Sequence, residues 1–429
     1  MSKLKLISDS GGGSVSLKAP ATTTGNAALE FTVPDVATGA TVLTSESSLT
    51  SSKLTGALPA ISGASLTGIT SSDTLPFRNL IINGDFQIAQ RSTAAVTTSN
   101  GSNEKYQTVD RFRIDMDNSV AVFTQQQVDL TAATDPDGFY KALKIDCTTA
   151  DASVGAGDWV SLQQEVEGLN WSRLNYGRSD AKTITVSFWV KSTKTGTYSF
   201  SIRNSAADRY YVAEYTVSAS DTWEKKTITI AGDTSGTWLI TNGIGARLGW
   251  SLIIGSTDSA TAGSWAAGNK FGSTNQVNFF DNTSNNFYIT GVQLEVGSEA
   301  TEFEHRSYAD GLRNCQRYFH RHCSADSTPI AQGMTYYSGQ AICPVSFPTT
   351  MRTKPSMTSY AGGAGAYTYR VVIHDASVYH HTIGMEATMS SESIATVTCD
   401  ASGQDHEANG VILLAHAGSP TNVAFDAEL

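Results

Sequence analysis

The middle of the chain alternates apolar and polar residues with a period of two, the spacing of a β-strand that buries one face. In the run 184–190, Ile-Thr-Val-Ser-Phe-Trp-Val, the even positions are apolar, and Thr185, Ser187 and Trp189 lie on the opposite face. Similar runs occur at 198–202, 211–217, 226–230 and 276–280. Gly, Asn, Asp and Ser clusters separate them, and no helical period of useful length appears. The pattern predicts an all-β, antiparallel sandwich or jelly roll.

Within one predicted strand, the apolar residues switch from odd to even positions. Phe287 and Ile289 are apolar at odd positions, whereas Val292, Leu294 and Val296 are apolar at even positions. A slip of one residue would send half of these side chains to the wrong face of the sheet. We therefore predict a β-bulge at Thr290-Gly291.

Aromatic and histidine positions divide the chain into three regions. Before Phe77 the only aromatic residue is Phe31, all seven tryptophans lie between Trp159 and Trp265, and all eight histidines lie from His305 onward. The predicted domains are 1–76, 77–304 and 305–429. In the last, a short helix is expected around 308–317, followed by the strands of a smaller β-sandwich domain. Its strand candidates are 318–323, 367–374, 394–399, 411–416 and 423–429.

The first region is rich in Ser, Thr, Ala and Gly and has too few large apolar groups to form its own core. It is either a flexible tail or a slender oligomeric stalk in which small apolar groups of several chains meet on one axis. Leu54-Thr55-Gly56 recurs as Leu66-Thr67-Gly68. This short repeat favours the stalk.

Charge and composition exclude several classes of function. The net charge is -11, which argues against nucleic-acid binding and against docking on an anionic membrane by charge. No apolar run approaches the roughly 20 residues of a membrane span, and no secretion signal is recognisable at Met1 to Ser10. The expectation is a protein made and assembled in a cytosol, without membrane insertion. Five cysteines without a CxxC pair argue against a disulfide framework.

Several motifs, in this order, resemble those of bacteriophage tail-fibre proteins. The stalk-like motif is LTGALPAI at 54–61. Motifs similar to the jelly-roll, carbohydrate-module-like domain of such fibres are FRNLIINGDF at 77–86, VDRF at 109–112, SFWVKS at 187–192 and FYITGVQLEVG at 287–297. Motifs similar to the joining segment and the distal domain of such fibres are FEHR at 303–306, NCQRY at 314–318, FPTTMR at 347–352 followed by Pro355, and FDAEL at 425–429.

This resemblance implies an elongated homotrimer in the phage tail of the virion, assembled in the host cytoplasm. The N-terminal segment 1–76 would dock to other phage tail proteins, and the C-terminal domains would face a host cell-surface glycan. Three weak sites on one fibre would raise the avidity of adhesion. The resemblance supplies no residue-level binding motif and implies no required cofactor.

Trp265 is the tryptophan hardest to place in a core, because it lies in a Gly/Ser/Ala/Thr-rich stretch, 255–274. Exposed aromatic rings stack on the apolar faces of sugars, so Trp265, with Trp238 nearby, is a candidate glycan-binding residue. The alternative is that Trp265 folds back and caps the sandwich.

Asp85 belongs to the Asn-Gly-Asp-Phe motif, which resembles the first strand of carbohydrate-binding jelly rolls that hold calcium. Asp281 or Glu295 from the far end of the module would be its partner ligand. Calcium needs several oxygen ligands, and Gln87 stands where such modules often have Glu. The alternative is that Asp85 bonds the backbone of a turn.

His320 and His322 alternate with Arg321 in an expected strand and so share one face. In a trimer this face could lie on the axis and present six imidazoles to one metal ion. The alternative is a solvated surface strand.

No GxSxG, HExxH or phosphate-binding loop occurs, and long β-helix repeats are absent. The chain is therefore expected not to be an enzyme, and the predicted function is adhesion to host glycan. The alternatives are a purely architectural tail or baseplate protein, a polysaccharide-degrading tail protein and, in third place, a cellular secreted lectin.

Overall fold

The computed structural model describes residues 77–101, 106–323, 328–336, 339–359, 369–373, 376–380, 383–400, 410–415 and 423–429. The predicted docking and stalk segment, 1–76, lies outside the described residues. Its expected repeat and its place in a trimer therefore stay predictions.

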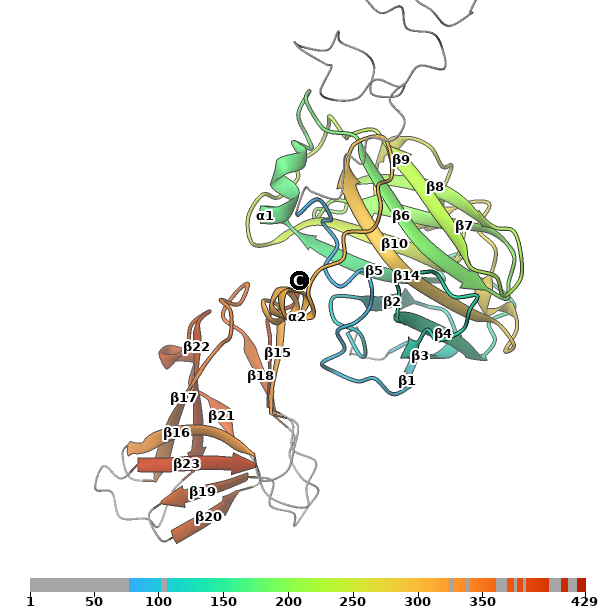
Figure 1. The fold of residues 1–429 in the computed structure, drawn as a ribbon. Coiled ribbons are helices and arrows are strands. Elements are labelled where there is room, and N and C mark those ends of the chain that lie inside the picture. Colours follow the sequence, from blue (N-terminus) through green and yellow to red (C-terminus); the bar gives the residue numbers. More distant parts are fainter. Residues whose placement is uncertain are drawn as a thin grey trace, which may run out of the picture. The chain divides into compact units, whose positions relative to one another are not determined.

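Two six-stranded sheets, built from antiparallel pairs, form a sandwich (Figure 1). In spatial order, the first sheet (sheet A) contains β1 (Val96–Ser99), β3 (Val122–Asp129), β4 (Lys141–Thr149), β14 (Asn286–Val296), β6 (Ile184–Ser192) and β9 (Glu224–Ile230). The second (sheet B) contains β12 (Trp265–Ala267), β8 (Arg209–Val217), β7 (Gly196–Arg203), β10 (Ile244–Ile254), β5 (Trp159–Glu167) and β2 (Arg113–Asp117). The prediction of an all-β sandwich is confirmed.

Short elements connect these strands. They are the helix α1 (Gly168–Trp171), the parallel pair β11 (Ser259–Ala260) and β13 (Gly272–Ser273), and the 3-10 turns η3 (Ser172–Leu174) and η4 (Phe279–Asp281). The turn η4 overturns a prediction, because the sequence pattern predicts a strand at 276–280. Asn278 accepts a hydrogen bond from the backbone N–H of Phe280 and closes a turn there instead.

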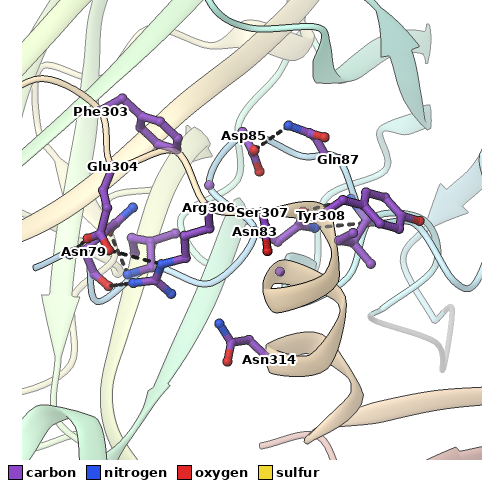
Figure 2. Close-up of a pocket in the computed structure, with 14 residues that line it drawn as sticks. Asn79, Asn83, Asp85, Gln87, Phe303, Glu304, Arg306, Ser307, Tyr308 and Asn314 are labelled. Atoms are coloured by element: carbon purple, nitrogen blue, oxygen red, sulfur yellow. Dashed lines mark hydrogen bonds and ion pairs between the residues drawn. The ribbon is translucent and has the colours of Figure 1, made fainter. Parts of the chain in front are cut away.

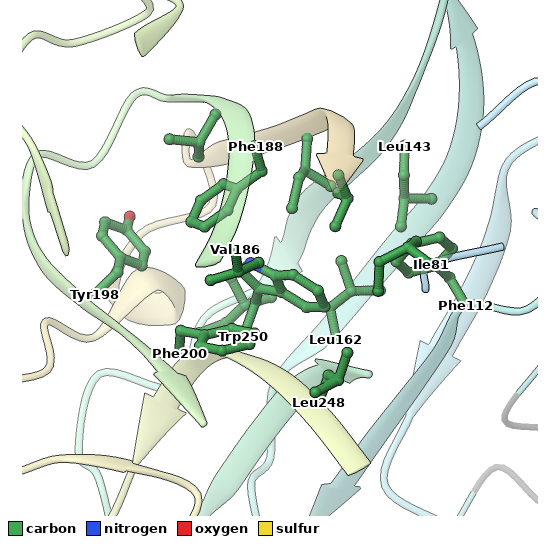
Figure 3. Close-up of a cluster of buried hydrophobic side chains, with 14 of the residues drawn as sticks. Ile81, Phe112, Leu143, Leu162, Val186, Phe188, Tyr198, Phe200, Leu248 and Trp250 are labelled. Carbon is green, nitrogen blue, oxygen red and sulfur yellow. The ribbon is translucent and has the colours of Figure 1, made fainter. Parts of the chain in front are cut away.

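The core lies between the two sheets (Figure 3). Trp250 of β10 is fully buried, and its ring centroid lies 5.1 Å from that of Phe200, 5.9 Å from Phe188 and 6.3 Å from Phe112. These side chains come from β10, β7, β6 and the residue before β2, so both sheets supply the same cluster. The inward face predicted for 184–190 is confirmed.

The predicted bulge is also present. The register of β14 against β6 shifts between Thr290 and Gln293, and Gly291 has φ +61°. Phe287 and Ile289 before it and Val292 and Leu294 after it are all buried. The extra residue therefore keeps both halves of β14 facing the core.

The predicted helix is α2 (Tyr308–Gln316), capped by the Ser307 side chain, which accepts from the Asp310 N–H. Two sheets follow it. In spatial order, the first is β15 (Phe319–Cys323), β24 (Val423–Asp426) and β18 (Ser356–Ser359). The second is β20 (Ala376–His380), β19 (Tyr369–Ile373), β23 (Gly410–Ala415), β16 (Pro329–Tyr336), β17 (Gln340–Ser346), β22 (Ile394–Asp400) and β21 (Gly384–Met385).

A second hydrophobic core joins these two sheets, with Val423 and Phe425 of the first packed in one cluster with Val397 and Leu413 of the second. The strand predictions in this region are confirmed to within a few residues. Within the described ranges, no helix is both long enough and apolar enough to cross a membrane.

His320 and His322 share one face of β15, as predicted, with Nε2 of His320 and Nδ1 of His322 3.4 Å apart. The His320 ring lies parallel to Phe425, is 9% exposed, and leaves its buried Nδ1 without a hydrogen-bond partner in the described structure. Burial, and then the nearby His322, lower the pKa of His320 to about 4. The folded domain therefore holds His320 neutral.

Acid should destabilise this domain through His320. An unfolded histidine titrates near 6.5, so the stabilisation is complete above pH 6.5 and is lost as the pH falls towards 4. We expect the free energy of unfolding, measured in urea, to drop by about 2 kcal/mol more in the parent than in His320→Phe between pH 7 and 4.5. Phe keeps the ring contacts and removes the titration. Equal drops in the two proteins would show that His320 does not titrate on unfolding.

Substitution of Gly291 should destabilise the sandwich. A Cβ there would lie 2.7 Å from Cζ of Phe139 and 3.1 Å from Cδ1 of Trp189, in a left-handed conformation. We expect Gly291→Ala to lower the free energy of unfolding by about 3 kcal/mol. Gly263→Ala is the matched control, because Gly263 also has positive φ (+102°) but has no atom within 4 Å of its Cβ position. If denaturant titrations gave both variants the same loss, steric crowding at the bulge would not be the cause.

Candidate functional site

A cleft of about 440 Å³ lies on the outer face of sheet A. Its lining comes from β6, β9 and β14, from the loop that follows β3, and from residues 301–305 after β14. The outer face is available because the opposite face of each strand is used by the core. A volume of this size lies within the range of roughly 300–1,000 Å³ that small ligands occupy in proteins.

Phe139 and Trp189 form the aromatic floor of this cleft, and Gly291 lies against both rings. The bulge places Gly291 where a side chain would collide with both rings. Phe139 is buried, with Phe303 packed edge-on at 5.0 Å, whereas Trp189 stays half-buried. The glycine thus lets both rings pack against the strand backbone, and the Trp189 side chain stays partly exposed to solvent.

Further aromatic side chains continue the same face. Trp223 belongs to the hydrophobic cluster of Phe139 and Trp189, and its ring lies 6.2 Å from that of Tyr288. Lys191 Nζ lies 4.5 Å from the Tyr288 ring centroid and 5.5 Å from that of Trp223, and the Trp223 Nε1–H donates to Asp135 at 2.9 Å. These contacts fix the rings in one orientation. The outer face of sheet A is therefore an ordered aromatic surface.

The rim of the cleft is polar. Asp137, Lys225, Thr301, Glu302 and His305 all line it, beside the rings. Aromatic rings can stack on the C–H face of a sugar, while such rim groups can bond its hydroxyls. The arrangement suits a neutral or weakly charged glycan, since the rim carries charges of both signs.

Sequence reasoning placed Trp189 on the polar face of its strand but did not single it out as a binding residue. The sequence did contain a signal, because Trp189 is a large aromatic residue among Thr, Ser and Lys on the outward face of its strand. Phe139 and His305 gave no such signal, since their meeting depends on contacts between residues 166 positions apart.

The structure places Trp265 and Trp238 at another part of the sandwich. Trp265 is half-buried, packs on Tyr176, Tyr211 and Trp238, and donates its Nε1–H to the Ala231 carbonyl at 2.6 Å. Trp238 is 6% exposed and stacks on Trp171. These contacts agree with the alternative interpretation, in which Trp265 caps the sandwich. Part of its ring still faces solvent. Glycan binding by this pair stays a prediction.

Asp85 lines a second, smaller pocket (Figure 2). This pocket lies between residues 79–88, residues 303–308 and α2, and its volume of about 30 Å³ is too small for a sugar ring. The Asp85 carboxylate accepts from the Gln87 side chain at 2.7 Å. Burial outweighs these hydrogen bonds and raises the pKa of Asp85.

The two proposed partners of Asp85 have other contacts. Asp281 pairs with Lys194 and accepts from the Asn285 amide at 2.8 Å. Glu295 accepts from the hydroxyl and the backbone N–H of Thr301 at 2.7 and 2.9 Å. No group of three or more potential His, Cys, Asp or Glu ligands occurs in the part of the chain that the structure describes. The calcium site therefore stays a prediction without a formed ligand set.

The histidine pair is turned towards its own domain. His322 Nε2 lies 2.7 Å from the Ile330 carbonyl oxygen, and the His320 ring faces Phe425 and Phe347. A metal ion shared on a trimer axis would require the imidazoles to leave these contacts. The axial metal also stays a prediction.

No protein-family model matches the sequence, and no curated protein matches it. Among solved structures, one similar chain is the enzymatically active domain of tailspike protein 4 of bacteriophage CBA120, with 11% identity and a TM-score of 0.26. The match covers 52% of this chain and 22% of that chain.

Carbohydrate-binding modules appear in the same comparison. One is TmCBM61 in complex with β-1,4-galactotriose, with 12% identity, a TM-score of 0.25, and coverage of 52% of this chain and 99% of that chain. Another is the family 11 module of a Clostridium thermocellum cellulosomal cellulase, with 10% identity, a TM-score of 0.24, and coverage of 49% and 99%. These likenesses are too distant to transfer a ligand to this chain.

Proposed function

We propose that this chain is a glycan-binding subunit of a phage tail fibre and that the cleft on the outer face of sheet A holds the glycan. The observation that carries the glycan proposal is the half-buried Trp189 ring on the floor of a 440 Å³ cleft with a polar rim. The fibre proposal is supported by the sequence motifs and their order along the chain. A homotrimer would bring three such clefts to one host surface and raise avidity.

Binding without hydrolysis is the proposed mode of action. Asp137 and Glu302 both line the cleft, so a polysaccharide-degrading protein is the alternative with a specific observation behind it. In an architectural tail protein, neither the Trp189 ring nor the polar rim of the cleft would bind a ligand. The same binding experiment separates the three functions if product release is measured beside affinity.

Removal of the Trp189 ring should weaken glycan binding. We expect Trp189→Ala to bind soluble host-surface oligosaccharide about tenfold more weakly, because stacking on the ring is lost. The measurement is a calorimetric titration of the full chain, with thermal unfolding of each variant to confirm that it is folded. Chromatography of the glycan afterwards detects any cleavage.

Trp265→Ala is the comparison variant, because it removes the other half-buried tryptophan that was proposed for glycan. Loss of affinity in Trp265→Ala alone would move the site to the Trp265 cluster. No binding by the folded parent would leave the architectural function, and shortened glycan would indicate an enzyme.

A further inference from the structure

The outer face of sheet B carries a different chemistry. Antiparallel registers align Arg247 of β10 with Arg203 of β7 and with Glu165 of β5, and the next row contains Arg113 and Gln163. We call these five residues the arginine cluster. Arg113, Gln163, Glu165 and Arg203 are each 9% exposed or less. Four polar side chains are therefore buried together on the face that does not form the core.

Glu165 neutralises two of the three arginines. Its Oε1 atom lies 3.0 Å from Nη2 of Arg113 and 2.9 Å from Nε of Arg247. Arg113 also pairs with Asp115 at 3.2 Å. These two guanidinium groups thus have their counter-charge within the protein.

Arg203 does not have such a counter-charge. Its guanidinium lies 3.8 Å from the Phe271 ring centroid, and Nη1 donates to the Asn269 side chain at 3.0 Å. Over the described ranges, Arg203 forms no ion pair with a carboxylate, although only 4% of it is exposed. A buried charge without a counter-ion is unfavourable, and burial together with Arg247 lowers the pKa of Arg203 to about 9. Glu165 and Asp115 are two carboxylates beside the three guanidinium groups, so the positive charge of the cluster is only partly neutralised.

Hydrogen-bond donors point to the same conclusion. Around this cluster, four buried donors have no hydrogen-bond partner in the described structure: Nε of Arg203, Nε of Arg113, the side-chain amide Nε2 of Gln163 and the hydroxyl of Ser201. The acceptor Oε2 of Glu165 has none either. Between Gln163 and Ser201 the register places Gly249, where a Cβ would lie 2.9 Å from Ser201 Oγ and 2.8 Å from Ser161 Oγ. The missing side chain lets the Ser161 and Ser201 hydroxyls lie against the strand backbone, beside Gln163.

We propose that the arginine cluster binds the carboxylate of an acidic sugar. A guanidinium matches the two oxygens of a carboxylate, and serine and amide donors satisfy the remaining lone pairs. Arg247 and Asp115 form the accessible edge, with side chains 20% and 16% exposed. Phe271 is buried between Trp159, which is stacked on it at 4.0 Å, and the Arg203 guanidinium, so it holds Arg203 in place within the cluster. The proposal rests on the proposed function only in assigning the carboxylate to a glycan.

The test is calorimetric titration of the full chain with glucuronate, acetate and glucose. We expect glucuronate to bind, glucose not to bind at this site, and the Kd for glucuronate to rise at least about tenfold in Arg203→Met. Met keeps the packing on Phe271 without the charge. Ser201→Ala removes one donor and retains the charge, so it should weaken binding less while folding normally. Arg178→Met is the control, since Arg178 is exposed and forms its ion pair with the exposed Asp180.

Each outcome decides the matter. Binding of acetate as well as glucuronate, with both lost in Arg203→Met, would support a carboxylate site that does not require the sugar ring. Binding of glucuronate alone would support an acidic-sugar site. No heat with either carboxylate, or equal affinity in the parent and Arg203→Met, would overturn the proposal. Failure at this cluster is distinguishable from failure of the sheet A cleft, because Arg203→Met with glucuronate and acetate tests the cluster, whereas Trp189→Ala with host-surface oligosaccharide tests the cleft.

Discussion

The packing of the two sheets around Trp250 decides which side chains remain available for binding. Strand side chains alternate between faces, so burial of Phe188 forces Trp189 outward, and burial of Ile202 forces Arg203 to the opposite face of its own sheet. The core cluster is contributed by both sheets (Figure 3), and a slip of one residue would reverse every face at once. Both proposed sites are therefore consequences of the register that the core imposes.

The two outer faces of the sandwich carry different chemistry. Sheet A presents rings whose partners hold them in place, with Lys191 over Tyr288 and Trp223 bonded to Asp135. Sheet B presents guanidinium groups held by Glu165 and by Phe271. In both cases the groups stand on strands rather than on free loops, so little conformational freedom is left to lose on binding. Taken together, the two proposals predict recognition of a glycan that combines neutral and acidic sugars.

The sequence was sufficient wherever a local period determined the structure. The face pattern of 184–190, the bulge at Gly291 and the helix 308–316 followed from spacing alone. The strand expected at 276–280 failed, because the Asn278 side chain offers the backbone a local bond that competes with pairing. The site was harder to predict. Trp265 is isolated in sequence, yet its neighbours Tyr176, Tyr211 and Trp238 come from distant segments.

The bulge at Gly291 links the cleft to the beginning of the described chain. Before it, residues 286–289 of β14 pair with β4; after it, the Val292 N–H donates to the Gly84 carbonyl and the Leu80 N–H to the Leu294 carbonyl. The segment 80–84 thus takes the place of β4 where the bulge ends that pairing. Since the same glycine leaves the space that Phe139 and Trp189 fill, the floor of the cleft and the anchoring of this segment depend on one backbone conformation. Replacement of Gly291 would therefore disturb the floor of the cleft and the anchoring of segment 80–84 together.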